Sequence, residues 1–135
     1  AGARNTGWIN ADGEAVIFID ADCMPEKDLI KKLLIHYDEN DIGAIAGSYS
    51  KDGFSNLLDR FVHLEIKYRH NRMPMYINSF GTYNVLVKRH VLDKLGGFDI
   101  AFRNASGEDS DLAYRILKAG YNLEGFSGCS PLITA

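Results

Sequence analysis

Apolar positions along this chain follow two periods, one typical of helices and one typical of strands. The apolar segments Ala15–Ile19 and Ile42–Tyr49 predict two strands. The first is a continuous run rich in Val and Ile, which indicates a central strand that is covered on both faces. The second contains Gly43 and Gly47, and glycine inside a strand is expected to weaken it.

Helix-spaced apolar positions fill most of the remaining chain. Pro25 suits the first turn of a helix that fades near Asn40 and whose apolar face is formed by Leu29, Ile30, Leu33 and Leu34. Other segments with this spacing, some of them closed by glycine, predict helices over 3–11, 56–72, 89–95 and 112–119. Two more strands are expected, one within 78–88, where Val85 and Val87 alternate with Leu86 and Lys88, and one at 123–126. The alternation of helices and strands predicts an α/β layer fold.

Composition narrows the class of protein. Of the 135 residues, 46% are hydrophobic and 24% are charged, so one domain with a packed core is expected and disorder is not. The net charge of -3, without a long basic run, argues against a nucleic-acid binder. Cys23 and Cys129 lack a CxxC spacing, which argues against a zinc knuckle or a disulfide framework and fits a reducing cytoplasm. The apolar runs are far shorter than the roughly 20 residues of a membrane span.

The stretch VIFIDADCMP places two acids, Asp20 and Asp22, where the first predicted strand ends. If Asp20 still follows the strand, both side chains project to the same side, because side chains alternate with a period of two. Carboxylates that close repel each other unless a cation lies between them, and hard divalent cations prefer oxygen ligands. A Mg²⁺ or Mn²⁺ site therefore explains the pair. The alternative is a solvated turn in which Asp22 caps the helix after Pro25.

A second acid cluster, Glu108, Asp109 and Asp111, stands at the start of a predicted helix. The helix dipole stabilises acids at this position, so the cluster has a sufficient structural explanation. Ligands of open α/β sheets, however, bind beyond the carboxyl ends of the strands, and both acid clusters can reach such an edge. One acid pair for a metal and another for proton abstraction would make a transferase site.

The four histidines are expected to be structural or surface groups. His63, His70 and His90 share no spacing typical of metal ligands, and His36 falls in the polar part of a helix.

Three segments resemble blocks of the family 2 glycosyltransferases. Ala3–Asn5 and the following GWINADGEAVIFIDADCMP resemble the segment that leads into the DxD motif of that family. GTYNVLVKRHVLDKLGGFD at Gly81–Asp99 and GEDSDLAYRILKAGY at Gly107–Tyr121 resemble its acceptor-side block and its catalytic block. A lone DxD is a weak signal, but these three blocks occur in the family's order and span nearly the whole chain.

The resemblance implies a GT-A fold, in which a Rossmann-like, mostly parallel mixed sheet flanked by helices binds a nucleotide-diphosphate sugar. It implies Asp22 as a ligand of Mn²⁺ or Mg²⁺, with Asp20 beside the metal or the nucleotide ribose. The cation would stabilise the charge that develops on the departing diphosphate. Asp109 would be the general base of an inverting transfer to a saccharide, lipid-linked or other hydroxyl acceptor, with Glu108 as the second candidate.

The same resemblance implies three further donor-site residues. Arg4 would lie near the nucleotide phosphates, and Gly81 and Asn84 would shape the floor beside the donor sugar. Glycine permits the close backbone approach that such a floor needs.

The strands and the turn that hold the nucleotide base in this family are expected before Ala3, and the given sequence does not contain them. The chain is therefore expected to be the back portion of a truncated GT-A domain, with a DxD segment over 1–50 and an acceptor-side and catalytic-base segment over 51–135. Truncation would expose a surface that favours a homodimer, and the fragment's own activity stays open. The expected location is the cytoplasm, with membrane association of the full-length parent left open.

Two other functions remain open. A non-catalytic domain of the same fold would bind a saccharide or a partner protein, but it has no need of two separate acid clusters. A nucleotidyltransferase also holds Mg²⁺ with paired acids at a strand end, but nucleotidyl transfer does not need the base in GEDSDL.

Overall fold

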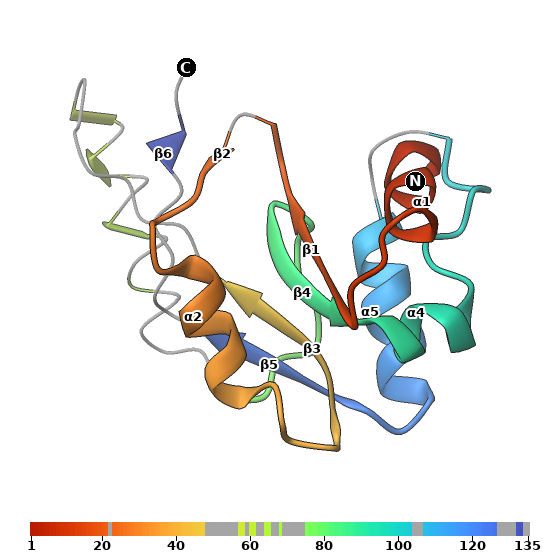
Figure 1. Ribbon diagram of the computed structural model, residues 1–135. Helices are drawn as coiled ribbons and strands as arrows, with labels where there is room; N and C mark the ends of the chain where they lie inside the picture. The colour runs from red at the N-terminus through yellow and green to blue at the C-terminus, as the bar shows by residue number, and fades with distance from the viewer. Residues whose placement is uncertain are drawn as a thin grey trace.

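The core lies on both faces of a four-stranded sheet, with helices on either side (Figure 1). The computed structural model describes residues 1–21, 23–47, 57–58, 60–61, 64–65, 68, 75–103, 107–126 and 132–133. The elements are α1 Gly2–Ile9, β1 Ala15–Ile19, β2 Cys23–Met24, α2 Leu29–Leu33, the 3₁₀ helix η1 Leu34–His36, β3 Ile42–Gly47, β4 Asn84–Lys88, α4 Arg89–Leu95, α5 Glu108–Lys118, β5 Asn122–Phe126 and β6 Leu132–Ile133.

The larger sheet has the strand order β1-β4-β3-β5. β4 runs antiparallel to both β1 and β3, and only β3 and β5 are parallel. The expected mixed sheet flanked by helices is confirmed, but the expected parallel majority is wrong for the described strands. The expectation that Ala15–Ile19 is a central strand is also wrong within these residues, because β1 pairs with β4 alone and β3 and β4 occupy the centre. The expected cover on both faces is also incomplete, because only Phe18 of β1 is buried and Ile19 is 39% exposed.

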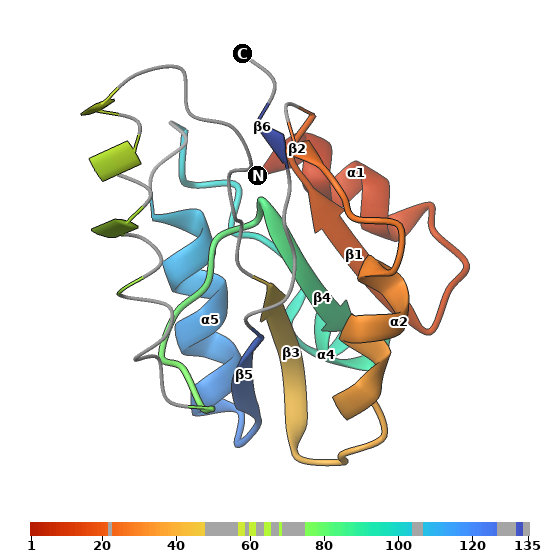
Figure 2. The ribbon, with the colours of Figure 1, turned by 90° about the vertical axis from the view of Figure 1, so that its left-hand side faces the viewer.

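The sheet lies between two helical layers, as Figure 1 shows, and Figure 2 views it from the side of α2. On one face, α2 packs against the sheet through a cluster of Leu29, Leu33, Ile42, Ile45 and Leu86. On the other face, α1, α4 and α5 surround a larger cluster whose fully buried members include Val85, Val87, Leu92, Leu112 and Ile116. The predicted alternation of β4 is confirmed, since Val85 and Val87 face one layer while Leu86 faces the other.

The helix after Pro25 begins later than expected. β2 extends the chain at Cys23–Met24, and α2 begins only at Leu29, so Pro25 lies outside the helix. The predicted apolar face is half correct, because Leu29 and Leu33 are buried whereas Ile30 and Leu34 are 61% and 45% exposed. The segment ends at His36 as a 3₁₀ turn, short of Asn40.

The remaining helix and strand predictions agree with the structure where it describes them. Within 56–72, the described positions 57–58, 60–61, 64–65 and 68 are helical, and the others lie outside the described residues. α4 ends at Gly96, whose φ of 77° requires the left-handed conformation that glycine adopts without strain. In the described part of the chain, none of the helices combines the length and apolar character that crossing a membrane requires.

Two glycines in β3, Gly43 and Gly47, allow neighbouring segments to pack closely against the strand. All six residues of β3 are buried. A Cβ at Gly43 would lie 2.8 Å from the side chains of Ile116 and Tyr121, so glycine lets α5 and its C-terminal turn approach the sheet. A Cβ at Gly47 would overlap the side-chain amide of Asn84 on the neighbouring strand. Close packing against α5 and β4 therefore explains why β3 tolerates glycine.

Candidate active site

The carboxyl end of β1 brings Asp20, the described member of the first acid cluster, to the start of β4. Ile19 is paired with Asn84, so Asp20 follows β1 at the edge where β4 begins. The side chain of Asp20 is 43% exposed, and its backbone carbonyl accepts a hydrogen bond from Cys23 N at 3.0 Å. Asp22 lies outside the described residues. Of the proposed metal pair, the structure therefore places only Asp20.

The second acid cluster stands at the first turn of α5. Gly107 precedes the helix with a φ of 93°, and Glu108, Asp109 and Asp111 all lie in its first turn, as the sequence predicted. Asp109 is half-buried, and its Oδ2 accepts hydrogen bonds from the backbone N–H of Thr82 at 3.1 Å and from Thr82 Oγ1 at 3.3 Å. Thr82, 2% exposed, thus fixes the orientation of this carboxylate.

Arg4 connects the two acid clusters. Its Nη1 donates to Glu108 Oε1 at 3.0 Å, and its Nη2 donates to Asp20 Oδ1 at 3.5 Å. The guanidinium is a rigid fork whose donors can serve two carboxylates at once. The structure therefore brings Arg4, Asp20 and Glu108 together. Arg4 was expected near the donor phosphates, and in the structure it binds these two acids.

Glu108 is the most buried acid of this group, with 4% of its side chain exposed. Its backbone N–H at the start of α5 and the guanidinium of Arg4 lower the pKa of Glu108, while burial opposes them. Its Oε2 has no hydrogen-bond partner among the described residues. A carboxylate held ionised against a cation accepts a proton poorly, so the geometry favours Asp109 over Glu108 as a base.

Replacing Glu108 by Gln is expected to lower the free energy of unfolding by about 2 kcal/mol at pH 7, because a charge-assisted hydrogen bond to Arg4 is lost. A carboxyl group whose pKa is lowered by folding contributes stability above its unfolded pKa and loses it as the pH falls through the folded value. The difference between wild type and Glu108→Gln should therefore shrink below about pH 4.5. Urea unfolding at pH 7, 5 and 3 measures it.

Glu14→Gln is the matched control, since Glu14 is an exposed acid. It should leave the free energy of unfolding within about 0.5 kcal/mol of wild type at each pH. A difference for Glu108→Gln that stayed constant from pH 7 to pH 3 would contradict the role given to the Arg4 pair.

Asn5 anchors the helix that carries Arg4, a role that the sequence did not indicate. Its Nδ2 donates to the carbonyl of Phe98 at 2.7 Å, and its Oδ1 accepts from Phe98 N at 2.9 Å and from Trp8 Nε1 at 3.0 Å. The amide thereby ties α1 to the turn after α4. The sequence offered one signal for this contact: both partners lie in motif blocks, Asn5 beside Arg4 in the block before DxD and Phe98 beside Gly97 in the acceptor-side block.

Gly81 and Asn84 lie on the segment that leads into β4. A Cβ at Gly81 would lie 2.5 Å from the ring of Tyr83, so only glycine fits beside that aromatic side chain. Asn84 is 2% exposed, and its Oδ1 has no hydrogen-bond partner among the described residues. Both residues therefore lie near the carboxyl end of β1, where the sequence expected a donor-site floor.

The profile of glycosyltransferase-like family 2 matches residues 1–129. The chain belongs to this family. Similar family relatives include a probable glycosyltransferase, YdaM, of Bacillus subtilis, 27% identical over 132 residues that cover 92% of this chain and 31% of that protein. A pre-mycofactocin glycosyltransferase of Mycobacterium tuberculosis is 28% identical over 130 residues, covering 91% and 27%. The chain thus spans about a third or less of the length of the curated relatives it matches.

Two solved structures show the fold of this family member. A mannosyltransferase from Pyrobaculum calidifontis, in complex with GDP-Man and Mn²⁺, superimposes with a TM-score of 0.68 at 23% identity, covering 98% of this chain and 35% of that one. Glucosyl-3-phosphoglycerate synthase from Mycobacterium tuberculosis, in complex with phosphoglyceric acid, gives 0.57 at 13% identity and covers 98% and 46%. The predicted GT-A fold is confirmed.

Proposed function

We propose that the full-length protein transfers a sugar from a nucleotide-diphosphate donor to a hydroxyl acceptor. The observation that carries this proposal is that Arg4 binds both Asp20, which follows β1, and Glu108, which stands beside Asp109 at the start of α5. The Asp109 carboxylate is oriented by two hydrogen bonds from Thr82 and is left half-exposed. A base waiting for an acceptor needs both properties.

Asp20 and Asp22 are proposed to hold Mn²⁺ or Mg²⁺. The donor set fits a hard cation, because both side chains offer carboxylate oxygens and Asp20 is open to solvent. When bound, such a cation supplies positive charge against the departing diphosphate. The mannosyltransferase from Pyrobaculum calidifontis contains GDP-Man and Mn²⁺, which supports this choice of donor and ion.

Asp109 is the proposed general base. It would take the proton of the acceptor hydroxyl, whose oxygen then attacks the anomeric carbon as the bond to the diphosphate breaks, inverting that carbon. Thr82 holds the carboxylate in place, and Glu108 keeps Arg4 at the same edge. Gly81 and Asn84 are proposed to border the donor sugar, and Arg4 to contact the diphosphate.

Nucleotide release by the natural full-length protein tests the proposal. With Mn²⁺ and a panel of nucleotide-diphosphate sugars that includes GDP-mannose, we expect release that chelation abolishes. Asp20→Asn is expected to lower release about 10- to 100-fold at subsaturating Mn²⁺, because a carboxylate at the metal edge is lost. Asp12→Asn, which changes an exposed turn acid, should match wild type. Release that survives both chelation and Asp20→Asn would refute the metal role.

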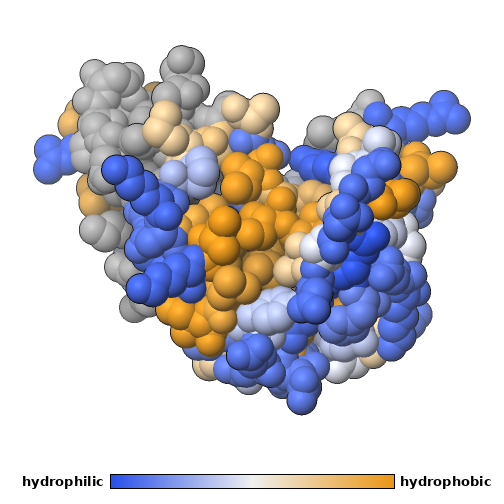
Figure 3. Space-filling view, in the orientation of Figure 1, coloured by the Kyte–Doolittle hydropathy of each residue, from blue (hydrophilic) through white to orange (hydrophobic). Residues whose placement is uncertain are grey.

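The homodimer and the cytoplasmic location stay predictions. Among the described strands, the outer edge of β1 has no partner, and unpaired edges favour pairing with another strand. Figure 3 shows apolar surface gathered over β1 and α2, whose exposed apolar residues include Ile19 and Ile30. This is the surface that a second copy would cover.

A further inference from the structure

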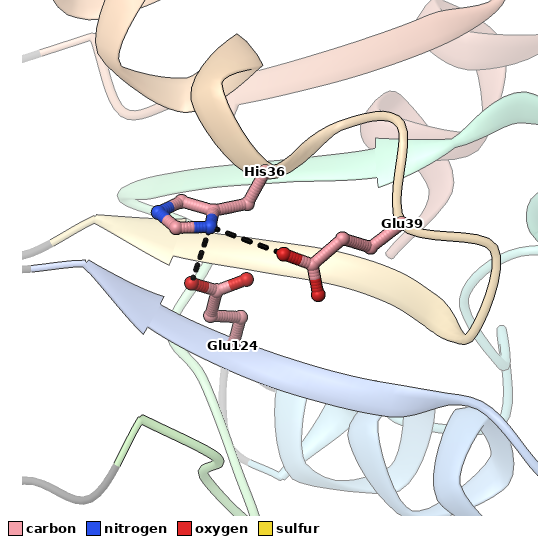
Figure 4. Close-up of side chains that lie close together, drawn as sticks. All are labelled: His36, Glu39 and Glu124. Atoms are coloured by element: carbon pink, nitrogen blue, oxygen red, sulfur yellow. Dashed lines mark hydrogen bonds and ion pairs between the residues drawn. The ribbon is translucent and has the colours of Figure 1, made fainter.

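Three side chains that the proposed transferase site does not use converge on the α2 side of the sheet (Figure 4). His36 ends η1, Glu39 lies in the loop before β3, and Glu124 lies in β5. Leu123 belongs to the cluster on the α5 side, so its neighbour Glu124 points to the opposite face. The three residues therefore come from separate segments and lie apart from the α5 layer that carries Glu108 and Asp109.

We propose that His36, Glu39 and Glu124 bind a zinc ion. His36 Nδ1 lies 3.4 Å from Glu39 Oε1 and 3.3 Å from Glu124 Oε1, and one ligand atom from each residue lies within 4.8 Å of the others. Zinc holds nitrogen and oxygen ligands at about 2.0–2.2 Å, which in tetrahedral geometry separates neighbouring ligand atoms by about 3.3–3.6 Å. The two contacts to Nδ1 already have this spacing.

The burial of Glu124 points to a cation. The residue is 2% exposed, and its Oε2 has no hydrogen-bond partner among the described residues, although its carboxylate points toward the other two side chains. A buried carboxylate costs free energy unless a charge compensates for it, and a bound metal ion supplies that charge. Glu39 and His36 are 43% and 27% exposed, so solvent reaches the site from their side.

The charges around the cluster favour the same ligand. Asp41, like Glu39, places a negative charge close to Glu124. The nearby cation Lys88 is engaged elsewhere, because its Nζ donates to the backbone carbonyl of Glu39 at 2.7 Å and lies 5.2 Å from the centre of the Tyr37 ring. Lys88 thus positions the loop that carries Glu39 without neutralising the carboxylates of Glu39 and Glu124.

One imidazole nitrogen with two carboxylates suits zinc better than the ions proposed for the other site. Mg²⁺, Ca²⁺ and Mn²⁺ prefer oxygen ligands throughout, whereas zinc readily combines His with Asp or Glu. Three protein ligands leave a fourth position for water. The ion would tie the η1–β3 connection to strand β5, which gives it a stabilising role separate from sugar transfer.

Calorimetric titration of the protein with ZnCl₂ tests the site. We expect His36→Gln and Glu124→Gln each to lose one zinc equivalent or bind it at least tenfold more weakly. His90→Gln, a control at an exposed histidine, and Asp20→Asn, a control at the proposed transferase site, should retain that equivalent. Zinc should also raise the Tm of wild type and His90→Gln but not of His36→Gln.

Equal zinc stoichiometry and affinity in His36→Gln, Glu124→Gln and His90→Gln would overturn the proposal, leaving the cluster as an ion triad around His36. Because His36 is partly exposed, His36→Gln is expected to fold, which circular dichroism checks. This outcome is independent of the transferase test, since it concerns residues on another face and does not measure activity.

Discussion

Replacing Asp109 by Asn in the full-length protein is expected to lower kcat about 1000-fold, or about 4 kcal/mol in the activation barrier. Asparagine keeps the size of the side chain but cannot take a proton from the acceptor hydroxyl. The hydrogen bond from Thr82 N–H can persist to the amide oxygen, so the site should keep its shape. The KM for the nucleotide sugar should therefore stay within about threefold of wild type, since the base acts in the chemical step.

Steady-state kinetics at saturating acceptor measures this effect. Asp111→Asn is the matched control, because Asp111 lies in the same first turn of α5 but is bound by Arg115 Nε at 2.8 Å. We expect its kcat within about threefold of wild type. A kcat reduced less than tenfold in Asp109→Asn would assign the base to another residue, with Glu108 the next to test.

Replacing Asn5 by Ala is expected to lower the free energy of unfolding by about 3 kcal/mol. The amide makes three hydrogen bonds, two of them to the backbone of Phe98, which is 2% exposed, and one to Trp8, which is 7% exposed. Its removal leaves a buried N–H, a buried carbonyl and an indole N–H without their partner. Each unsatisfied buried group costs about 1–3 kcal/mol, and water that enters the vacated space offsets part of the sum.

Urea unfolding at pH 7 measures the loss. Asn10→Ala is the control, because Asn10 also donates a side-chain hydrogen bond, to Thr6 O at 2.8 Å, but at an exposed helix end. It should lose no more than about 1 kcal/mol. If the two variants lost equal stability, the link between α1 and the turn after α4 would not be the anchor inferred for Arg4.

The sequence was most informative where the physical cause is local. The glycine stop at Gly96 was predicted because a left-handed residue suits glycine whatever surrounds it. β4 was predicted because its alternation reflects two covered faces, and the acids at the start of α5 were predicted to suit a helix N-terminus. The three motif blocks also indicated the family, which the match over residues 1–129 bears out.

Tertiary structure decided the features that depend on residues distant in the chain. Arg4 and Glu108 are 104 positions apart, and no local pattern pairs a guanidinium with one of several acids at that distance. The same holds for Glu124. The sequence showed a lone acid in an apolar strand, but it did not indicate that His36 is its partner. Strand direction and the edge position of β1 were likewise beyond local periodicity, because a buried apolar run has the same sequence whether its neighbours run parallel or antiparallel. Sequence thus determined the elements and the acids they carry, and packing determined which charges meet, because electrostatic contacts depend on distance in space.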